Sequence, residues 1–221
     1  TVEDRLCHSL HAYFIRPGDP EVPVVYQVDR ARDGGSFTTR RVVAIQHGRQ
    51  ILNMSASFHI QEDGWAHQHP MPDVQGPEDL ADRGTLRAAV VQHIPEQYHE
   101  EFLRPRPIDI REVAPRDFFT PPPEDDVSHL WFRMAAARGI APDLQPCLLA
   151  YASDLNLLGT ALRPHGQTWF TGKVMAASLD HAMWFHAPAE FCDWHLYTMD
   201  SPWAGNGRGF NRGKIYDRDG R

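Results

Sequence analysis

The sequence predicts an α+β fold built from two similar halves, and three observations carry this prediction. Several segments alternate apolar and polar side chains, which is the pattern of half-buried strands. Residues 146–162 instead repeat apolar side chains every three or four positions, as a helix does. In addition, residues 9–26 resemble residues 178–197. Two related sets of strands around a long helix account for all three observations.

The first part of the chain consists of strand patterns separated by turns. The cluster Arg16-Pro17-Gly18-Asp19-Pro20 and the segment Asp33-Gly34-Gly35 are turn signals. His47-Gly48 stands between two strand patterns and predicts a hairpin, because glycine tolerates the positive φ of a tight turn. The predicted strands are residues 6–14, 22–28, 37–46 and 50–60.

The middle of the chain changes character. Residues 62–107 are polar and rich in proline, with short helix patterns at residues 86–93 and 96–103, so we interpret this segment as a connection. Strand patterns then resume, at residues 108–111, 130–134, 168–170, 173–185, 194–199 and 209–216. The predicted parts of the chain are a first half over residues 1–62, a linker over residues 63–106 and a second half over residues 107–221.

The helix of residues 146–162 contains the most informative residue of the chain. Apolar side chains occupy most of its positions, so we expect it to be covered on most sides. Asp154 stands in its middle, where aspartate has poor helix propensity and where a buried carboxylate costs several kcal/mol unless it is paired. Local rules of this kind are broken mainly at functional sites. Asp154 is therefore a candidate functional residue.

The internal repeat keeps the order of strand, turn and hairpin. Tyr26 matches Tyr197, and with one residue of slippage Arg40 matches Arg212. The second copy follows a long helix, whereas the first copy begins where such a helix would already have ended. We therefore expect that a helix of the first half precedes the sequence and that at least one strand of the second half follows it. Two copies of strand, long central helix and antiparallel strands make a double hot-dog fold, in which each antiparallel sheet wraps a central helix.

The composition excludes several classes of protein. The net charge of −7 argues against a nucleic-acid partner, which requires a basic face. Apolar runs stay well short of the roughly 18 residues of a membrane span. The three cysteines are odd in number and widely spaced, which favours free thiols in a reducing compartment over disulfides. We expect a cytoplasmic protein without a membrane span.

Five segments carry a family pattern: residues 8–19, 33–42, 54–58, 151–156 and 179–186. They include Asp33-Gly34-Gly35-Ser36-Phe37 and Leu179-Asp180-His181-Ala182, and they occur in a fixed order along nearly the whole chain. With these segments the chain resembles the acyl-CoA thioesterase II (TesB-like) family. The resemblance is weakest over residues 75–105.

The resemblance implies a reaction and a site. The family's site is described as an aspartate, a hydroxyl residue and a glutamine that orient a water molecule. The aspartate corresponds to Asp154, and the hydroxyl residue, usually threonine, corresponds to Ser178. The glutamine would lie on a strand after Gly220, beyond the last residue. The implied reaction is hydrolysis of acyl-CoA to free fatty acid and coenzyme A. Acyl-CoA is then the substrate partner, no cofactor or metal is required, and the protein is expected to form a homo-oligomer.

The chemistry of a thioester suits this small site. A thiol pKa near about 8.5 makes thiolate a tolerable leaving group, so one carboxylate that acts as base on water is sufficient. In an apolar helix we expect the pKa of Asp154 to rise toward neutrality, which suits a base. A backbone N–H at a helix end would stabilise the oxyanion. Taken without the resemblance, Asp154 has an equally good structural interpretation, in which it caps a helix or pairs with an arginine.

The remaining motifs have structural interpretations. Four histidines lie on strand patterns among aromatic residues without metal-ligand spacing, so we expect packing or hydrogen-bonding roles. Residues 205–209, Gly-Asn-Gly-Arg-Gly, precede a strand and predict a hairpin turn rather than a phosphate-binding loop. The sequence lacks Gly-x-Ser-x-Gly, which speaks against an α/β-hydrolase. The histidines are His8, His11, His181 and His186, and the aromatic residues expected in the sheet core are Trp184, Phe185, Trp194 and Tyr197.

Two further functions stay open beside thioester hydrolysis. One is a non-catalytic hot-dog module that binds acyl-CoA or lipid. The other is a hot-dog enoyl-CoA hydratase or dehydratase. Thiol release, binding without release, and addition of water to enoyl-CoA distinguish the three functions.

Overall fold

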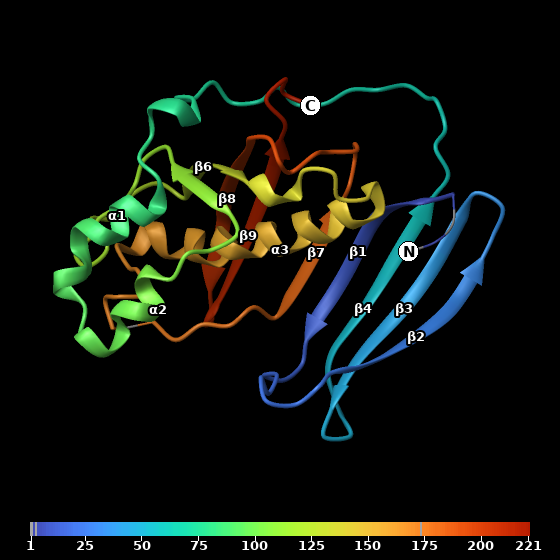
Figure 1. The fold of residues 1–221 in the computed structure, drawn as a ribbon, viewed down its shortest axis with the longest axis horizontal. Coiled ribbons are helices and arrows are strands. Elements are labelled where there is room, and N and C mark those ends of the chain that lie inside the picture. Colours follow the sequence, from blue (N-terminus) through green and yellow to red (C-terminus); the bar gives the residue numbers. More distant parts are fainter. Residues whose placement is uncertain (1, 3, 173) are drawn as a thin grey trace. The chain divides into compact units, whose positions relative to one another are not determined.

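A computed structural model describes residues 2, 4–172 and 174–221, whose strands form two antiparallel sheets (Figure 1). The first sheet has the order β2-β3-β4-β1-β7, and the second has the order β5-β6-β8-β9. The predicted α+β class with two antiparallel sheets is confirmed. The strands of the first sheet are β1 (Leu6–Phe14), β2 (Val25–Asp33), β3 (Phe37–Gln46), β4 (Arg49–His59) and β7 (Asp180–Trp184). Those of the second are β5 (Asp109–Glu112), β6 (Val127–Arg133), β8 (His195–Gly205) and β9 (Arg208–Tyr216).

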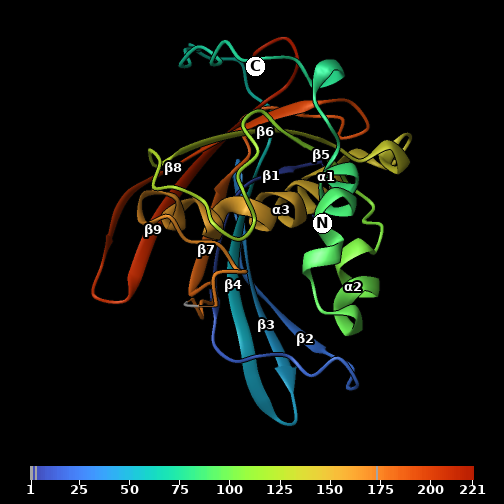
Figure 2. The same ribbon diagram turned by 90° about the vertical axis from the view of Figure 1, so that its left-hand side faces the viewer.

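Along the chain, α1 (Arg83–Val90) and α2 (His99–Leu103) come between β4 and β5, and the long helix α3 (Gln145–Leu157) comes between β6 and β7. The short helices α1 and α2 contact each other within the predicted linker, as Figure 2 shows. Single 3₁₀ turns occupy Pro77–Asp79, Val91–His93, Glu96–Tyr98, Ala135–Ala137 and Pro142–Leu144.

The long helix differs from its prediction in its last turns. Residues 146–162 were expected to be one α-helix, but α3 ends at Leu157 and a 3₁₀ helix, Leu158–His165, follows it. Pro164 has no N–H for the α-helical bond to the carbonyl four residues before it, and its ring clashes with that carbonyl. Gly166 then ends the segment with a left-handed backbone, at φ 59°.

Contacts along the chain divide it into two compact units. Unit 1 contains Thr1–His67, Ala141–Ala150 and Ala176–Pro188. Unit 2 contains Gln68–Ile140, Tyr151–Met175 and Ala189–Arg221. The three sequence parts proposed above, with boundaries near residues 62 and 107, stay a prediction.

The first sheet, in unit 1, has two different faces. Ala12 of β1, Ala44 of β3 and Ala56 of β4 are buried, and the strand register places all three on the same face of the sheet. His11 and Tyr13 lie on the other face of β1 and are exposed. This alternation is the period-2 pattern from which the strands were predicted. The outer strand β2 is exposed along its whole length.

The second sheet, in unit 2, buries side chains of β6 and of the first part of β8 on both faces. Leu130 and Phe132 of β6 lie on one face, opposite Tyr197 and His195 of β8. The last turns of α3 contact this face, where the Tyr197 hydroxyl donates a hydrogen bond to the backbone carbonyl of Ser153. The opposite face carries a buried cluster of Trp131, Trp194, Leu196 and Tyr216, against which Met71, Val74, Leu80 and Val113 pack.

Part of the predicted linker therefore has a packing role. The Trp131 Nε1–H donates a hydrogen bond of 2.8 Å to the carbonyl of Gln75, which anchors this proline-rich segment to the sheet. A buried indole N–H requires such a partner. The sequence interpretation of residues 62–107 as a plain connection was incomplete, because apolar residues spaced between prolines show no helix or strand period.

The repeat is visible in the strand register. Tyr26 of β2 pairs with Ala44 of β3, and Tyr197 of β8 pairs with Ile215 of β9, so one offset of 171 residues relates both partners. Both hairpins also change register at the same place, after Asp29 and after Asp200. This agreement confirms the duplication.

One detail of the predicted alignment is wrong. The common offset makes Arg41, and not Arg40, the counterpart of Arg212, since Arg41 pairs with Asp29 as Arg212 pairs with Asp200. The hairpins therefore align without slippage. The error arose because adjacent arginines give a sequence comparison two equivalent choices, whereas strand pairing allows only one.

The two copies of the first repeat strand pair with each other. In the antiparallel pair β1 and β7, His11 lies opposite Ala182, and these two residues are themselves equivalent in the repeat. Ser9 lies opposite Trp184 and Tyr13 opposite Asp180. A local two-fold axis therefore passes through the pair of His11 and Ala182.

Candidate functional site

Asp154 lies on the exposed side of α3. Its side chain is exposed, and so are the neighbouring Tyr151 and Leu155, whereas Ala152 and Ser153 are buried. The expectation that Asp154 is buried is therefore wrong, because it lies in the exposed stripe of α3 with Tyr151 and Leu155, whereas most other residues of the helix are buried or half-buried. A helix with apolar residues on nearly every side has no periodic signal that tells which face is buried.

The structural alternative for Asp154 finds no support among the described side chains. None of the described arginine and histidine side chains lies within ion-pair distance of its carboxylate. Asp154 stands in the interior of α3 rather than at its first residue, so it does not cap this helix. Its carboxylate is thus available to a ligand or to water.

Tyr197 lies beneath this part of α3. Its Oη–H donates a hydrogen bond of 2.8 Å to the carbonyl of Ser153, the residue that precedes Asp154. Tyr197 is 3% exposed. Burial raises the pKa of the Tyr197 phenol well above its usual value, and the negative charge of Asp154 raises it further. The phenol therefore stays protonated and acts as a hydrogen-bond donor.

Ser178 lies in the segment that leads into β7. It is half-buried, and β7 begins two residues later, at Asp180. Ser178 belongs to unit 1, and Asp154 belongs to unit 2. Their common site stays a prediction, because each residue is placed only within its own unit.

Two of the four singled-out histidines have the predicted structural roles. His8 Nε2 lies 2.8 Å from Ser57 Oγ, and its ring meets the Phe37 ring edge-on with centroids 5.7 Å apart. The His11 ring meets Trp184 in the same way, at 5.2 Å. Packing and hydrogen bonding account for both side chains.

The four aromatic residues expected in the sheet core differ in burial, and Phe185 is half-buried. Trp194 and Tyr197 are buried, as predicted. Trp184 is 56% exposed, so its assignment to the core was wrong. Trp184 lies at the end of β7, an edge strand of the first sheet, where one flank has no neighbouring strand.

The glycine-rich segment of residues 205–209 is a hairpin turn, as predicted. β8 ends at Gly205 and β9 begins at Arg208. Asn206 and Gly207 between them both have positive φ, 49° and 68°, as a type I′ turn requires.

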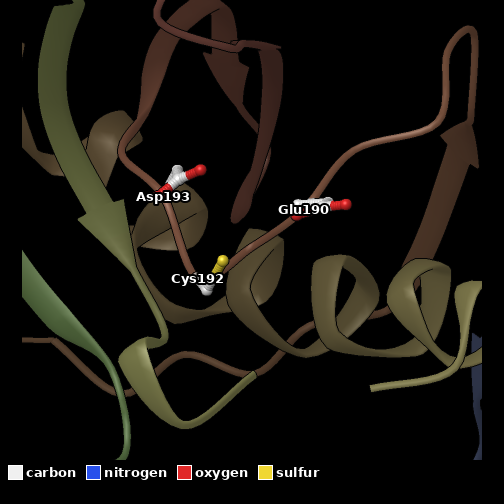
Figure 3. Close-up of side chains that lie close together, drawn as sticks. All are labelled: Glu190, Cys192 and Asp193. Atoms are coloured by element: carbon white, nitrogen blue, oxygen red, sulfur yellow. The ribbon is translucent and has the colours of Figure 1, made fainter. Parts of the chain in front are cut away.

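One group of possible metal ligands was missed in the sequence. Ligand atoms of Glu190, Cys192 and Asp193 lie within 4.8 Å of one another in the turn before β8 (Figure 3). Cys192 is buried, and the two carboxylates are exposed. The signal was a cysteine between acidic residues. Exposed carboxylates in one turn occur commonly without an ion, so this group by itself is no metal site.

Comparison with known proteins agrees with this arrangement. Residues 1–59 match the family model described as the acyl-CoA thioesterase N-terminal domain, and residues 74–221 match the acyl-CoA thioesterase C-terminal domain. Acyl-CoA thioesterase 2 of Haemophilus influenzae is 37% identical over 219 residues, which cover 99% of this chain and 77% of that protein. Human acyl-coenzyme A thioesterase 8 is 40% identical over 229 residues, covering 99% of this chain and 70% of that protein.

Solved structures give the same assignment. The acyl-CoA thioesterase II TesB2 from Mycobacterium marinum is 40% identical, with a TM-score of 0.78 over 100% of this chain and 77% of that chain. A hot-dog protein from Alicyclobacillus acidocaldarius, 18% identical, has the same fold, with a TM-score of 0.74 over 97% of this chain and 74% of its own. From the family models, the relatives and the fold together, the chain belongs to the acyl-CoA thioesterase family.

Proposed function

We propose that this chain hydrolyses acyl-CoA thioesters to free fatty acid and coenzyme A, with a water molecule that is activated by Asp154. Membership of the family makes the chain a thioester hydrolase. The relatives from Haemophilus influenzae and human carry the name acyl-CoA thioesterase, which supports acyl-CoA as the substrate. Coenzyme A is then part of the substrate and not a cofactor.

The observation that carries the role of Asp154 is its free carboxylate on an anchored helix. The carboxylate is exposed, and no described arginine pairs with it, while the backbone just before it is held by Tyr197. An ionised carboxylate within reach of water is able to accept a proton as the water attacks the thioester carbonyl. The thiolate then leaves and takes up the proton, so no strong general acid is needed.

Ser178 is the proposed partner of Asp154. Its hydroxyl both donates and accepts hydrogen bonds, so it is suited to orient the attacking water. This role is carried over from the family resemblance onto the residue just before Leu179-Asp180-His181. It requires that Ser178 and Asp154 meet around one water in the active enzyme.

Location and assembly stay predictions. In the part of the chain that the structure describes, no helix combines the length and apolar character needed to cross a bilayer. A cytoplasmic location rests on the free cysteines, since Cys7, Cys147 and Cys192 are all unpaired. We propose a homo-oligomer on the resemblance alone.

A thiol-release assay on a panel of acyl-CoAs tests the proposal in the full-length protein. Asp154→Asn removes the base and keeps the side-chain size, so we expect kcat to fall by about 10²- to 10⁴-fold. KM should change little, because the lost interaction acts in the transition state. Asp143→Asn, at an exposed aspartate just before α3, is the matched control and should retain wild-type turnover.

The outcome of this assay separates the competing functions. Wild-type turnover in Asp154→Asn would show that Asp154 is not the base. Ser178→Ala should lower kcat by about 10-fold through loss of water positioning. Tight binding of acyl-CoA without thiol release would instead support a binding module, and addition of water to enoyl-CoA would support a hydratase.

A further inference from the structure

We propose that Tyr197 is the positioning residue for Asp154, a role that rests on the proposed function. The Tyr197 Oη–H donates to the carbonyl of Ser153 at 2.8 Å, one residue before the carboxylate. Tyr197 comes from the central strand β8, and Ser153 comes from α3. The bond therefore ties the helix to the sheet at the place where the base is presented.

The phenol is a fixed point because its ring has little freedom. Tyr197 is almost completely buried, and the ring of Phe132 on β6 packs against it edge-on with centroids 6.4 Å apart. On the other flank, Gly213 of β9 leaves the ring only enough space for a hydrogen atom, since a Cβ there would lie 2.9 Å from Tyr197 Cζ. Neighbouring strands thus hold the ring from both sides.

A bond to this particular carbonyl controls where Asp154 points. In an α-helix the carbonyl of Ser153 already accepts the amide four residues later, and the phenol uses its second lone pair. Consecutive residues are rotated by about 100° around the helix axis, as 3.6 residues per turn require. When Ser153 is held against the sheet, Asp154 is turned onto the exposed flank, where it is found.

Electrostatics also connect the two side chains. The charge of Asp154 contributes to the raised pKa of Tyr197, so the two groups lie within electrostatic reach of each other. The phenol remains protonated at the pH at which a carboxylate acts as base. Its O–H dipole therefore stays available to the Ser153 carbonyl throughout turnover.

The repeat provides an internal comparison. Tyr26 occupies the position of Tyr197 in the first hairpin, and it is 65% exposed. Val42 stands there in place of Gly213. The hairpin thus forms in the same register whether or not its tyrosine is buried, so hairpin formation does not explain the buried, hydrogen-bonded state of Tyr197.

The test is a double-mutant cycle with Tyr197→Phe and Asp154→Asn in the full-length protein. Tyr197→Phe keeps the ring and removes the donor, and we expect kcat per folded molecule to fall by about 10-fold with KM changed by less than about 2-fold. The same substitution in the Asp154→Asn background should have no further effect, because a positioning residue acts only through the group that it positions. Tyr26→Phe is the matched control and should retain full activity.

A second variant keeps the test valid if Tyr197→Phe folds poorly. Incorporation of 3-fluorotyrosine at position 197 retains the O–H at nearly the same size, and it should retain kcat within about 2-fold. Activity is expressed per folded molecule by near-ultraviolet circular dichroism. Loss of activity in this O–H-retaining variant, with the fold intact, would overturn the role.

The outcomes distinguish this inference from the proposed function. A Tyr197→Phe enzyme that unfolds at a lower temperature but has wild-type kcat per folded molecule would mean that the bond only stabilises packing. Effects of Tyr197→Phe and Asp154→Asn that multiply would mean that Tyr197 acts independently of Asp154. Full turnover in Asp154→Asn would overturn the base and the positioning role together, whereas an inactive Asp154→Asn beside a fully active Tyr197→Phe overturns the positioning role alone.

Discussion

Gly213 lies against the ring of Tyr197, and a Cβ at Gly213 would lie 2.8 Å from the Tyr197 hydroxyl oxygen. The two residues are on adjacent strands, β9 and β8. The space that this glycine leaves open is the space that the phenol uses to reach α3. A buried tyrosine and a glycine beside it therefore act as one pair.

Gly213→Val, which copies Val42 of the first hairpin, should displace the Tyr197 ring. We expect a loss of about 1–3 kcal/mol in the free energy of unfolding from overpacking, measured by urea denaturation. Turnover should fall as well, because the phenol loses its acceptor. Gly35→Ala is the control, since no atom of the described residues lies within 4 Å of a Cβ added there, and it should stay within about 0.5 kcal/mol. A fully stable Gly213→Val would contradict the contact.

His195 should make stability depend on pH. Its Nδ1–H donates to the carbonyl of Asp193 at 3.0 Å, and its Nε2 is buried without a hydrogen-bond partner among the described atoms. Burial lowers the pKa of His195, which outweighs the opposing effects of the Asp193 carbonyl and of the charges on Asp217 and Asp193. The ring packs on Phe191 with centroids 4.6 Å apart.

The sign of this dependence follows from proton binding. Below a pH of about 6.5, His195 is protonated in the unfolded chain but remains largely neutral in the folded protein. The unfolded state then binds more protons, so the free energy of unfolding should fall as the pH is lowered. One such proton changes stability by up to about 1.4 kcal/mol per pH unit. Denaturation curves between pH 5 and pH 8 measure the slope, in wild type and in His195→Phe. An unchanged slope in the variant would assign the dependence to other groups.

Asp82 should stabilise α1 as its N-cap. Its carboxylate accepts hydrogen bonds from the Thr85 backbone N–H at 2.9 Å and from the Thr85 hydroxyl at 2.6 Å. These bonds lower the pKa of Asp82. Asp82→Ala should cost about 1 kcal/mol and should reduce the amide exchange protection of α1. Asp82→Asn keeps the cap and should differ little from wild type, and equal losses in both variants would exclude the capping role.

Glu124 should stabilise the segment after α3 through two arginines. Its Oε2 lies 2.6 Å from Arg163 Nη2 and 3.3 Å from Arg116 Nε, and both arginine side chains are nearly buried. Glu124→Gln would leave two buried cations without a counter-charge, so we expect a loss of about 3 kcal/mol in the free energy of unfolding. Asp200→Asn, which breaks the more exposed pair with Arg212, should cost clearly less. Chemical denaturation of both variants compares the two pairs.

The hairpins were predictable from sequence because their signals are local. His47-Gly48 and Asn206-Gly207 supply the positive φ that two-residue turns need, and the alternation of β3 and β9 fixes which side chains share a face. The repeat added long-range information, since Tyr26 and Tyr197 have equivalent strand partners. Sheet class and duplication follow from these features alone.

The exposure of Asp154 and the anchoring role of Tyr197 were not predictable. Residues on all sides of α3 are apolar, so periodicity does not distinguish the side at Ala152, which is buried, from the side at Leu155, which is 40% exposed. The Tyr197 bond joins residues 44 positions apart, to a backbone carbonyl that carries no sequence signal. Such a contact becomes visible only when helix and sheet are brought together.

Val42 and Gly213 stand at the same place in the two copies of one hairpin. The two hairpins have the same strand pairing but differ in the side chain that fits at this position. The first hairpin holds a branched valine there, whereas the second has no room for a side chain beside Tyr197. Exchanging the hairpins would keep every strand pairing and still remove the anchor beneath Asp154. The two halves of this chain are thus alike in architecture but no longer interchangeable as parts.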